Sequence, residues 1–226
     1  LMTMKAETFA ARAIAASCAV AIDMTNATGE AEWKSRAAFL TPITKAFGTD
    51  VGVEVAQMGV QVHGGMGVIE ATGAAQYCRD VRVTAIYEGT NGIQAMDLVG
   101  RKMMDGGEAA FRLLEEIEAG AEAARGTMPD LAGAVWAAAE TLRETTEALI
   151  GLSAQDRFAG AVPYLRAMAR VLGGHYHLMA ARADGADGAR TALARFFIRR
   201  LLPEHAALLQ HAREGADGLY ALTTGD

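Results

Sequence analysis

The run Ile86-Tyr87-Glu88-Gly89-Thr90-Asn91-Gly92-Ile93-Gln94 marks the point where a chain of long helix-forming segments must turn. It places one carboxylate, that of Glu88, in an uncharged turn of Gly, Thr and Asn between a polar helical segment and an apolar one. A carboxylate there has few neighbours to neutralise it, and a ligand that excludes water would make it a stronger proton acceptor. The alternative is that Glu88 merely lies near a helix start, where the helix dipole favours an acid.

A second signal lies upstream, at Gln61-Val62-His63-Gly64-Gly65-Met66-Gly67. Three glycines in four positions follow a long segment with helical periodicity, although one glycine is enough to cap a helix. The surplus indicates backbone that approaches a flat or phosphorylated group closely. A simple helix end is the alternative. His63 is expected to interact with the last carbonyls of that helix.

Composition restricts the class of protein. The 226 residues include only four prolines, and no long run of alternating β-branched residues occurs, so we expect an all-α fold. The net charge of −6 argues against a nucleic-acid binder, which should carry a basic face. No run of eighteen apolar residues occurs, so we expect no membrane span. Cys18 and Cys78 are lone thiols without metal spacing, which favours a cytoplasmic location.

The apolar spacing and the turn residues predict a series of helices separated by short connections. We expect them over residues 1–26, from near Ser35 or Pro42 to His63, from an N-cap at Thr72 to Val81, and over 91–104, 108–124, 131–151, 153–183 and 189–215. In the 91–104 segment, Ile93, Met96 and Val99 or Gly100 should face inward. We expect Asp130 to be an N-cap and residues 184–188 to form a connection. Pro163 should kink or break its helix, and the last helix should be broken or bent near Pro203. The domain boundary is expected at 105/106.

The two segments together resemble the C-terminal region of the acyl-CoA dehydrogenase family. The resemblance runs from about Met2 to Met104 and includes four motifs in the family's order and spacing: Lys45-Ala46-Phe47-Gly48, Gln61–Gly67, Tyr77–Val81 and Ile86–Gln94. Residues 106–226 resemble the helical extension of one bacterial subgroup, which includes enzymes acting on 3-methylmercaptopropionyl-CoA.

The resemblance implies an antiparallel helical bundle over residues 1–105, followed by a second helical extension over 106–226. Complete family members also have an N-terminal helical domain and a middle β-domain. We therefore expect the sequence to be a fragment in which even the bundle lacks its first helix.

The resemblance also implies a reaction, in which flavin takes a hydride from the β-carbon of an acyl-CoA while a glutamate removes the α-proton. Glu88 would be that catalytic base. Its backbone N–H, with a ribityl hydroxyl of the flavin, would bind the thioester oxygen, where negative charge develops. Tyr87 would line the acyl pocket, with core packing as its alternative. Gly89 would let the chain pass the thioester without a Cβ.

Four further residues are implied to bind FAD. Thr90 would reach the flavin nucleotide while also capping the next helix. Gln61, Gly64 and Gly65 would meet the adenosine diphosphate half of an FAD held mainly by a neighbouring subunit, so a homo-oligomer, dimer or tetramer, is expected. Gly92 departs from the family pattern, in which Glu or Gln usually follows Thr-Asn. Electron-transfer flavoprotein is the implied redox partner, although an oxidase would use the same base.

A second reading belongs to another functional class: the chain alone could be a non-catalytic helical module for assembly. Because the fragment lacks the β-domain that covers the flavin, we expect it to be inactive and to hold FAD poorly. No metal site is expected. His175 and His177 are two residues apart, which directs them to different faces of a helix.

Overall fold

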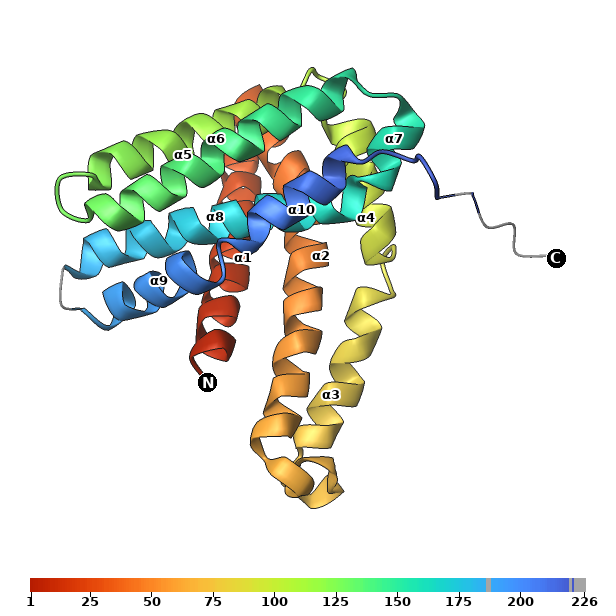
Figure 1. The fold of residues 1–226 in the computed structure, drawn as a ribbon, viewed down its shortest axis with the longest axis vertical. Coiled ribbons are helices and arrows are strands. Elements are labelled where there is room, and N and C mark those ends of the chain that lie inside the picture. The colour runs from red at the N-terminus through yellow and green to blue at the C-terminus, as the bar shows by residue number, and fades with distance from the viewer. Residues whose placement is uncertain (186–187, 220, 222–226) are drawn as a thin grey trace.

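The structure, a computed structural model, describes residues 1–185, 188–219 and 221, and its regular elements in that part of the chain are all helices (Figure 1). The all-α class is therefore confirmed. The order is α1 (Met2–Thr28), α2 (Ala31–Val62), η1 (Gly64–Val68), η2 (Glu70–Thr72), α3 (Ala74–Arg82), η3 (Val83–Ala85), α4 (Asn91–Asp97), η4 (Leu98–Lys102), α5 (Glu108–Ala124), α6 (Pro129–Gly151), α7 (Ala154–Ala159), α8 (Ala161–Asp184), α9 (Ala189–Arg200) and α10 (Glu204–Arg213).

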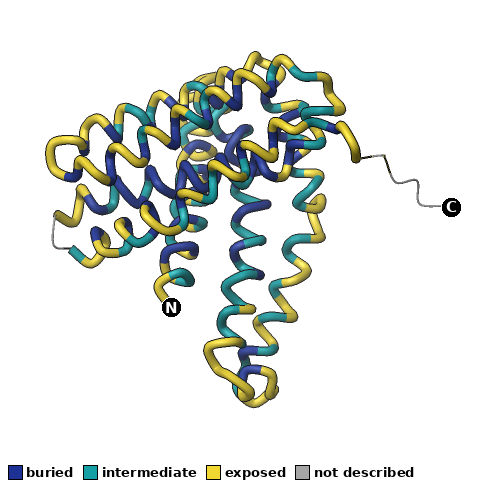
Figure 2. Tube along the Cα trace, in the orientation of Figure 1, coloured by how far each residue is buried: buried dark blue, intermediate teal, exposed yellow. Residues whose placement is uncertain are grey.

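Two regions differ in packing. Helices α1 and α2 form a long antiparallel pair, and α5, α6, α8, α9 and α10 stack across one end of it (Figure 1). The other end of α2 continues beyond this stack, and α3 returns along it, so that α2 and α3 form a protruding hairpin. Burial is concentrated in the stack, whereas the hairpin tip is mostly exposed (Figure 2). The hairpin thus presents a large surface outside the core.

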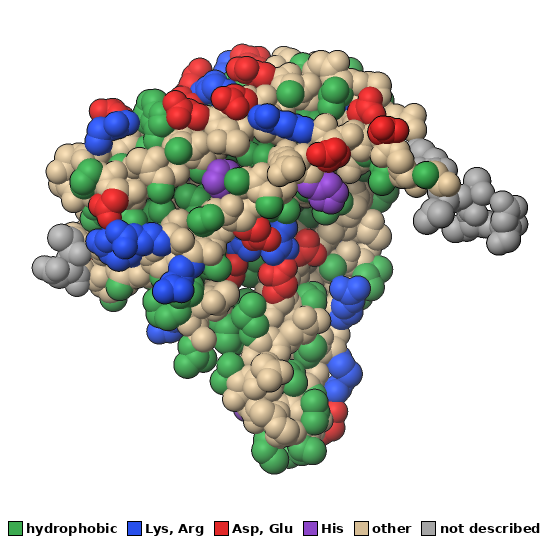
Figure 3. Space-filling model, in the orientation of Figure 1, with side chains coloured by type: hydrophobic (Ala, Val, Ile, Leu, Met, Phe, Trp, Pro, Cys, Tyr) green, Lys and Arg blue, Asp and Glu red, His purple; other side chains and the backbone are tan. Residues whose placement is uncertain are grey.

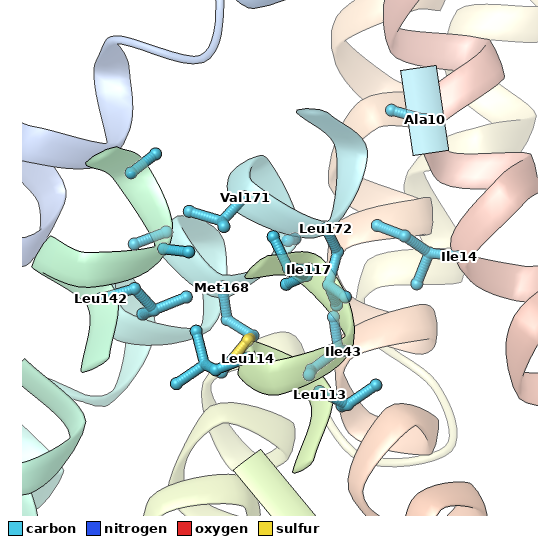
Figure 4. Close-up of a cluster of buried hydrophobic side chains, with 14 of the residues drawn as sticks. Ala10, Ile14, Ile43, Leu113, Leu114, Ile117, Leu142, Met168, Val171 and Leu172 are labelled. Atoms are coloured by element: carbon cyan, nitrogen blue, oxygen red, sulfur yellow. The ribbon is translucent and has the colours of Figure 1, made fainter. Parts of the chain in front are cut away.

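The core is continuous across the boundary expected at residue 105. Ile14 of α1 and Ile43 of α2 lie among Leu114, Leu142 and Met168 of α5, α6 and α8 (Figure 4). All five side chains are fully buried. The extension therefore shares one hydrophobic core with the bundle, and the division into residues 1–105 and 106–226 stays a prediction about sequence units.

Helix α2 begins earlier than expected. Gly29, with φ 70°, ends α1, and only Glu30 separates it from the first residue of α2, Ala31. Residues 31–34, which precede the earliest expected start near Ser35, are helical because Glu, Lys and Trp are compatible with a helix. Pro42 consequently lies in the helix interior, buried, rather than in a first turn.

Two expected caps are wrong. Gly73 precedes α3, and the Thr72 hydroxyl instead donates hydrogen bonds to the carbonyls of Met66 and Ile69. Asp130 lies inside the first turn of α6, because the preceding Pro129 occupies the first helical position, for which its fixed φ is suited.

The segment expected as one helix over 91–104 divides into α4 and the π-helical η4. Val99 is buried as expected, but Ile93 is 56% exposed and Met96 is 38% exposed, so these two do not face the core. Ala95 and Leu98 take their place.

Of the two helix interruptions expected at prolines, one is found at its proline and the other is displaced. Pro203 separates α9 from α10 as predicted. The interruption expected at Pro163 is a break that falls earlier, at Gly160, so Pro163 lies in the first turn of α8 without bending it. The connection expected over 184–188 includes residues 186–187, which lie outside the described residues.

One described helix, α1, has the length and apolar composition needed to cross a membrane, with a mean hydropathy of 1.3 over its most apolar window. One stripe of α1 packs into the core through Ala6, Ala10, Ile14, Cys18 and Ala21. A core helix passes the same composition test, so this is weak evidence for a membrane span. The absence of a span stays a prediction.

Candidate active site

The Glu88 turn connects η3 to α4 at the end of the hairpin nearer the core (Figure 1). Thr90 is the N-cap of α4, and its side-chain oxygen accepts a hydrogen bond from the backbone N–H of Ile93 at 3.4 Å. The capping role expected for Thr90 is therefore confirmed. A hydroxyl that accepts at the cap still has its own hydrogen to donate, so capping leaves Thr90 able to bind a ligand.

Glu88 has an unusual backbone. Its φ is 56°, the one positive value among the non-glycine residues that the structure describes. Left-handed backbone is costly for a residue with a Cβ, and such strain is often retained at functional sites. Gly89 follows with φ 82°, which only glycine adopts readily. Together the two residues direct the turn sharply into α4.

The Glu88 side chain is exposed, and its carboxylate makes no hydrogen bond or ion pair with any residue in the described part of the chain. Tyr87 is also exposed, at 55%, so the core-packing alternative for Tyr87 is wrong. Both side chains are therefore exposed to solvent, where a ligand could contact them.

The backbone of the turn, in contrast, is held firmly. Lys45 Nζ of α2 donates to the Gly89 carbonyl at 2.7 Å and to Asn91 Oδ1 at 2.8 Å. Gln94 Nε2 donates to the Glu88 carbonyl at 3.0 Å. The carbonyls of Glu88 and Gly89 are therefore fixed by side chains from α4 and α2, respectively.

Lys45, Asn91 and Gln94 lie within the family motifs, but the sequence did not predict that their side chains would hold the backbone of the turn. The contact from Lys45 to Asn91 spans 46 residues, which local spacing does not reveal. One sequence signal was available: Lys45 is the only Lys or Arg between Arg36 and Arg79. A single cation in such a long apolar and acidic segment is a candidate for a specific contact.

The glycine-rich bend forms the tip of the hairpin. Gly64 has φ 60°, and a Cβ added at Gly67 would lie 2.2 Å from the Val60 carbonyl oxygen. The fold itself therefore explains both of these glycines. His63 Nδ1 lies 2.8 Å from the Gly59 carbonyl, which confirms its expected helix-end role.

Gly65 is the glycine that the fold does not explain. It has ordinary negative φ, and an added Cβ would meet nothing within 4 Å. Gln61, Gly64 and Gly65 are all exposed. A backbone left bare and open to solvent fits a flat group that approaches from outside the chain, as the adenosine diphosphate of FAD would.

The structure does not bring the two expected halves of the site together. The glycine-rich bend precedes α3 and the Glu88 turn follows it, so they lie at opposite ends of the hairpin (Figure 1). One chain therefore cannot bring both to the same small ligand. Contact between the bend and the flavin of a neighbouring subunit stays a prediction.

Two grooves of the surface lie away from the Glu88 carboxylate. A groove of about 730 Å³ runs along α1, and another of about 500 Å³ lies between α2 and α3. Neither is lined by Glu88. In the described part of the chain, the Glu88 side chain thus lies on exposed surface outside both grooves.

Comparison with known proteins identifies the fold. "Acyl-CoA dehydrogenase, C-terminal domain" matches residues 1–104, and "Acetyl-CoA dehydrogenase C-terminal like" matches residues 113–223. The 3-methylmercaptopropionyl-CoA dehydrogenase of Ruegeria pomeroyi is 39% identical over 94% of this chain and 39% of its own length. The butyryl-CoA dehydrogenase of Syntrophomonas wolfei is 35% identical over 52% of this chain and 20% of its own length. The chain thus spans well under half the length of these relatives.

Two solved structures share the fold. Caenorhabditis elegans ACDH-11, in complex with C11-CoA, has a TM-score of 0.73 at 20% identity, over 87% of this chain and 34% of its own. An acyl-CoA dehydrogenase complexed with FAD from Bacillus anthracis has a TM-score of 0.72 at 19% identity, over 100% of this chain and 42% of its own. Fold and matches together define a helical C-terminal region of the dehydrogenase class. The chain belongs to the acyl-CoA dehydrogenase family, as the sequence resemblance predicted.

Proposed function

We propose that the enzyme containing this chain dehydrogenates an acyl-CoA thioester at its α and β carbons, with Glu88 as the base that removes the α-proton. The observation that carries this proposal is the combination of a free carboxylate with a strained, firmly held backbone at Glu88. The positive φ and the firmly held carbonyl distinguish Glu88 from an ordinary unpaired surface glutamate. A base must be held in place without being neutralised.

The neighbours of Glu88 have matching roles. The thioester oxygen, where enolate charge develops, would accept a hydrogen bond from the Glu88 backbone N–H. Gly89 would let the chain pass the thioester, and Tyr87 would line the acyl chain. An acyl-CoA covering this exposed turn would exclude water from the carboxylate and make it a stronger base.

FAD is the proposed cofactor, and when bound it would supply the hydride acceptor. Thr90 would bind it beside the base. Gln61, Gly64 and Gly65 would bind the adenosine diphosphate half of the FAD of a neighbouring subunit, in a dimer or tetramer. Hydrophobic side chains that gather over the protruding hairpin support such an assembly (Figure 3); the exposed ones are Val62, Met66, Val68, Ile69, Tyr77 and Val83.

The decisive experiment is Glu88→Gln in the FAD-loaded enzyme that contains this chain. The amide keeps the shape of the side chain but cannot accept the proton. Flavin reduction by acyl-CoA, followed anaerobically by stopped-flow absorbance, should slow by about 10²–10⁴-fold or more, with FAD content unchanged. Glu115→Gln is the matched control, because Glu115 is an exposed glutamate of α5 that forms no ion pair with the residues the structure describes. Reduction at the native rate in Glu88→Gln would refute the assignment.

The chain as it stands is proposed to lack activity and to hold FAD poorly, because Glu88 lies on open surface. Incubation with FAD followed by desalting tests this. A yellow, stoichiometric complex would overturn it. Loss of all FAD together with a stable dimer or tetramer would support the alternative role of this length of chain as an assembly module.

The electron acceptor is proposed to be electron-transfer flavoprotein. Enzyme reduced anaerobically by acyl-CoA should pass its electrons to that protein faster than to air. Faster reoxidation by oxygen would identify an oxidase with the same base.

A further inference from the structure

Several of the hydrogen bonds that connect the Glu88 turn to α2 are made by one side chain, that of Asn91. Its Nδ2 donates to Asp50 Oδ1 at 2.6 Å and to Thr49 Oγ1 at 2.9 Å, and its Oδ1 accepts from Lys45 Nζ. Asn91 is only partly exposed and follows Thr90 directly. Lys45 also holds the Gly89 carbonyl, so the position of Asn91 relative to α2 and that of the turn depend on the same side chain.

The far side of Asn91 is covered by the C-terminal extension. An enclosed pocket of about 80 Å³ separates Asn91 and Asp50 from α8, and its α8 wall consists of Val162, Leu165 and Arg166. Helix α8 also packs directly against α4 and α2. Arg166 therefore lines the same pocket as Asp50 and Asn91, and the space between them is large enough for ordered water.

Arg166 is itself fixed from two directions. Its Nη1 donates to Glu54 Oε1 of α2 at 2.6 Å, and its Nε donates to Glu204 Oε1 of α10 at 3.2 Å. Glu54 lies one turn from Asp50 on the same helix. Glu204 also accepts from Arg170 Nε at 2.5 Å, which connects Arg166 to the buried core. A side chain held in this way can transmit the position of α8 to the Asn91 cluster.

We propose that Arg166 of the C-terminal extension is a positioning residue for the Glu88 turn, acting through Asp50 and Asn91. This inference rests on the proposed role of Glu88 as the base. The extension would then contribute to catalysis indirectly. Helix α8 would pack against α4 and α2 and so fix the position of the turn relative to α2. Arg166 touches neither substrate nor flavin in this scheme, so its removal should change the rate of the chemical step more than substrate binding.

The test uses Arg166→Met, which keeps the length of the side chain and removes its hydrogen bonds. In this chain, hydrogen exchange at the amides of Ile93 and Gln94, which bond to Thr90, should accelerate roughly tenfold. In the FAD-loaded enzyme, the rate of flavin reduction should fall about 10–100-fold with little change in KM, as a small misplacement of a catalytic group does. Asn91→Ala should show the same pattern more strongly.

Arg195→Met, which removes a surface ion pair of the same extension, is the matched control and should change neither readout. Arg166→Lys keeps the charge and should show a smaller shift in the same direction. It also serves if Arg166→Met does not fold. Unchanged exchange and unchanged reduction in the Arg166 variants, beside a slow Glu88→Gln, would overturn this inference alone. Faster exchange beside a Glu88→Gln that reacts at the native rate would overturn the proposed function instead.

Discussion

Glu7 of α1 and Arg170 of α8 are 163 residues apart in the chain and form a two-point contact, with Arg170 Nη1 at 2.5 and 2.6 Å from the two carboxylate oxygens. Both side chains are 3% exposed. Burial raises the pKa of Glu7 above its ordinary range, although the charge of Arg170 opposes that shift. The pair connects the first helix of this chain to α8 of the extension, inside the shared core.

Breaking this pair from one side should be costly, because a charge would remain buried without a partner. Arg170→Met is expected to lower the free energy of unfolding by about 3–5 kcal/mol in urea denaturation at pH 7. The double variant Glu7→Leu with Arg170→Met should recover most of that loss. Arg195→Met, at a surface pair, should cost less than about 1 kcal/mol. Equal effects of the buried and surface variants would contradict the contact.

The glycine-rich bend offers a matched pair of substitutions. Gly67→Ala places a Cβ 2.2 Å from the Val60 carbonyl, so η1 must shift, and we expect a loss of about 1–3 kcal/mol. Gly65→Ala meets nothing within 4 Å, and its effect on stability should stay within about 0.5 kcal/mol. Thermal unfolding with hydrogen exchange over residues 60–73 measures both.

The same two substitutions distinguish an effect on stability from an effect on flavin binding. In the FAD-loaded enzyme, Gly65→Ala should weaken flavin binding although the fold is intact, because its methyl group would occupy the surface proposed for the adenosine diphosphate. Normal flavin affinity in Gly65→Ala would leave Gly65 without a role in the cofactor site.

Helix propensity and flanking glycines predicted the bounds of a helix well where no tertiary contact determined them. Helix α5 has the expected bounds, Glu108–Ala124, because Gly107 precedes it, and residues of high helix propensity fill it. The break before α8 was misplaced because its cause is tertiary: a Cβ at Gly160 would lie 2.2 Å from the carbonyl oxygen of Ala212, on α10. A proline is visible in a sequence, but the close approach of a distant helix is not.

The candidate site shows the same division. Glu88, Gly89 and Thr90 were located by their own residue types in one short run. The residues that hold them, Lys45 and Asn91, belong to separate motifs, and their contact appears only when α2 and α4 pack together. Arg166 lies still further along the chain, and no spacing rule connects it to the turn.

The backbone at Glu88 can be tested separately from its chemistry. A left-handed conformation costs a residue with a Cβ roughly 1–2 kcal/mol, which glycine avoids at some cost in chain entropy. We therefore expect Glu88→Gly to unfold at a higher temperature than Glu88→Ala, since both lack the carboxylate and differ only in the Cβ. Higher stability of Glu88→Ala would show that φ at this position is not positive in solution.

The last prediction concerns acid. His177 of α8 is 1% exposed, its ring lies 4.5 Å from the rings of both Phe9 and Phe197, and its Nε2 is 3.1 Å from the Ala6 carbonyl. Burial lowers the pKa of His177 from 6.5 to about 4, against the opposing hydrogen bond to Ala6. The unfolded chain therefore takes up this proton first as the pH falls. Stability that is fully present above pH 6.5 should be lost progressively towards pH 4, by about 3 kcal/mol in total.

Urea denaturation at several pH values between 7 and 4.5 measures this loss. Above pH 4.5 the other strongly shifted acid, Glu116, does not interfere, because hydrogen bonds from His175 and Arg36 lower its pKa from 4.5 to about 2. His177→Phe keeps an aromatic ring between Phe9 and Phe197 and removes the titrating group, so its stability should vary much less over the same range. A native chain whose free energy of unfolding stays constant over that range, or a His177→Phe variant that keeps the full native slope, would show that this imidazole is not the buried group that acid must charge.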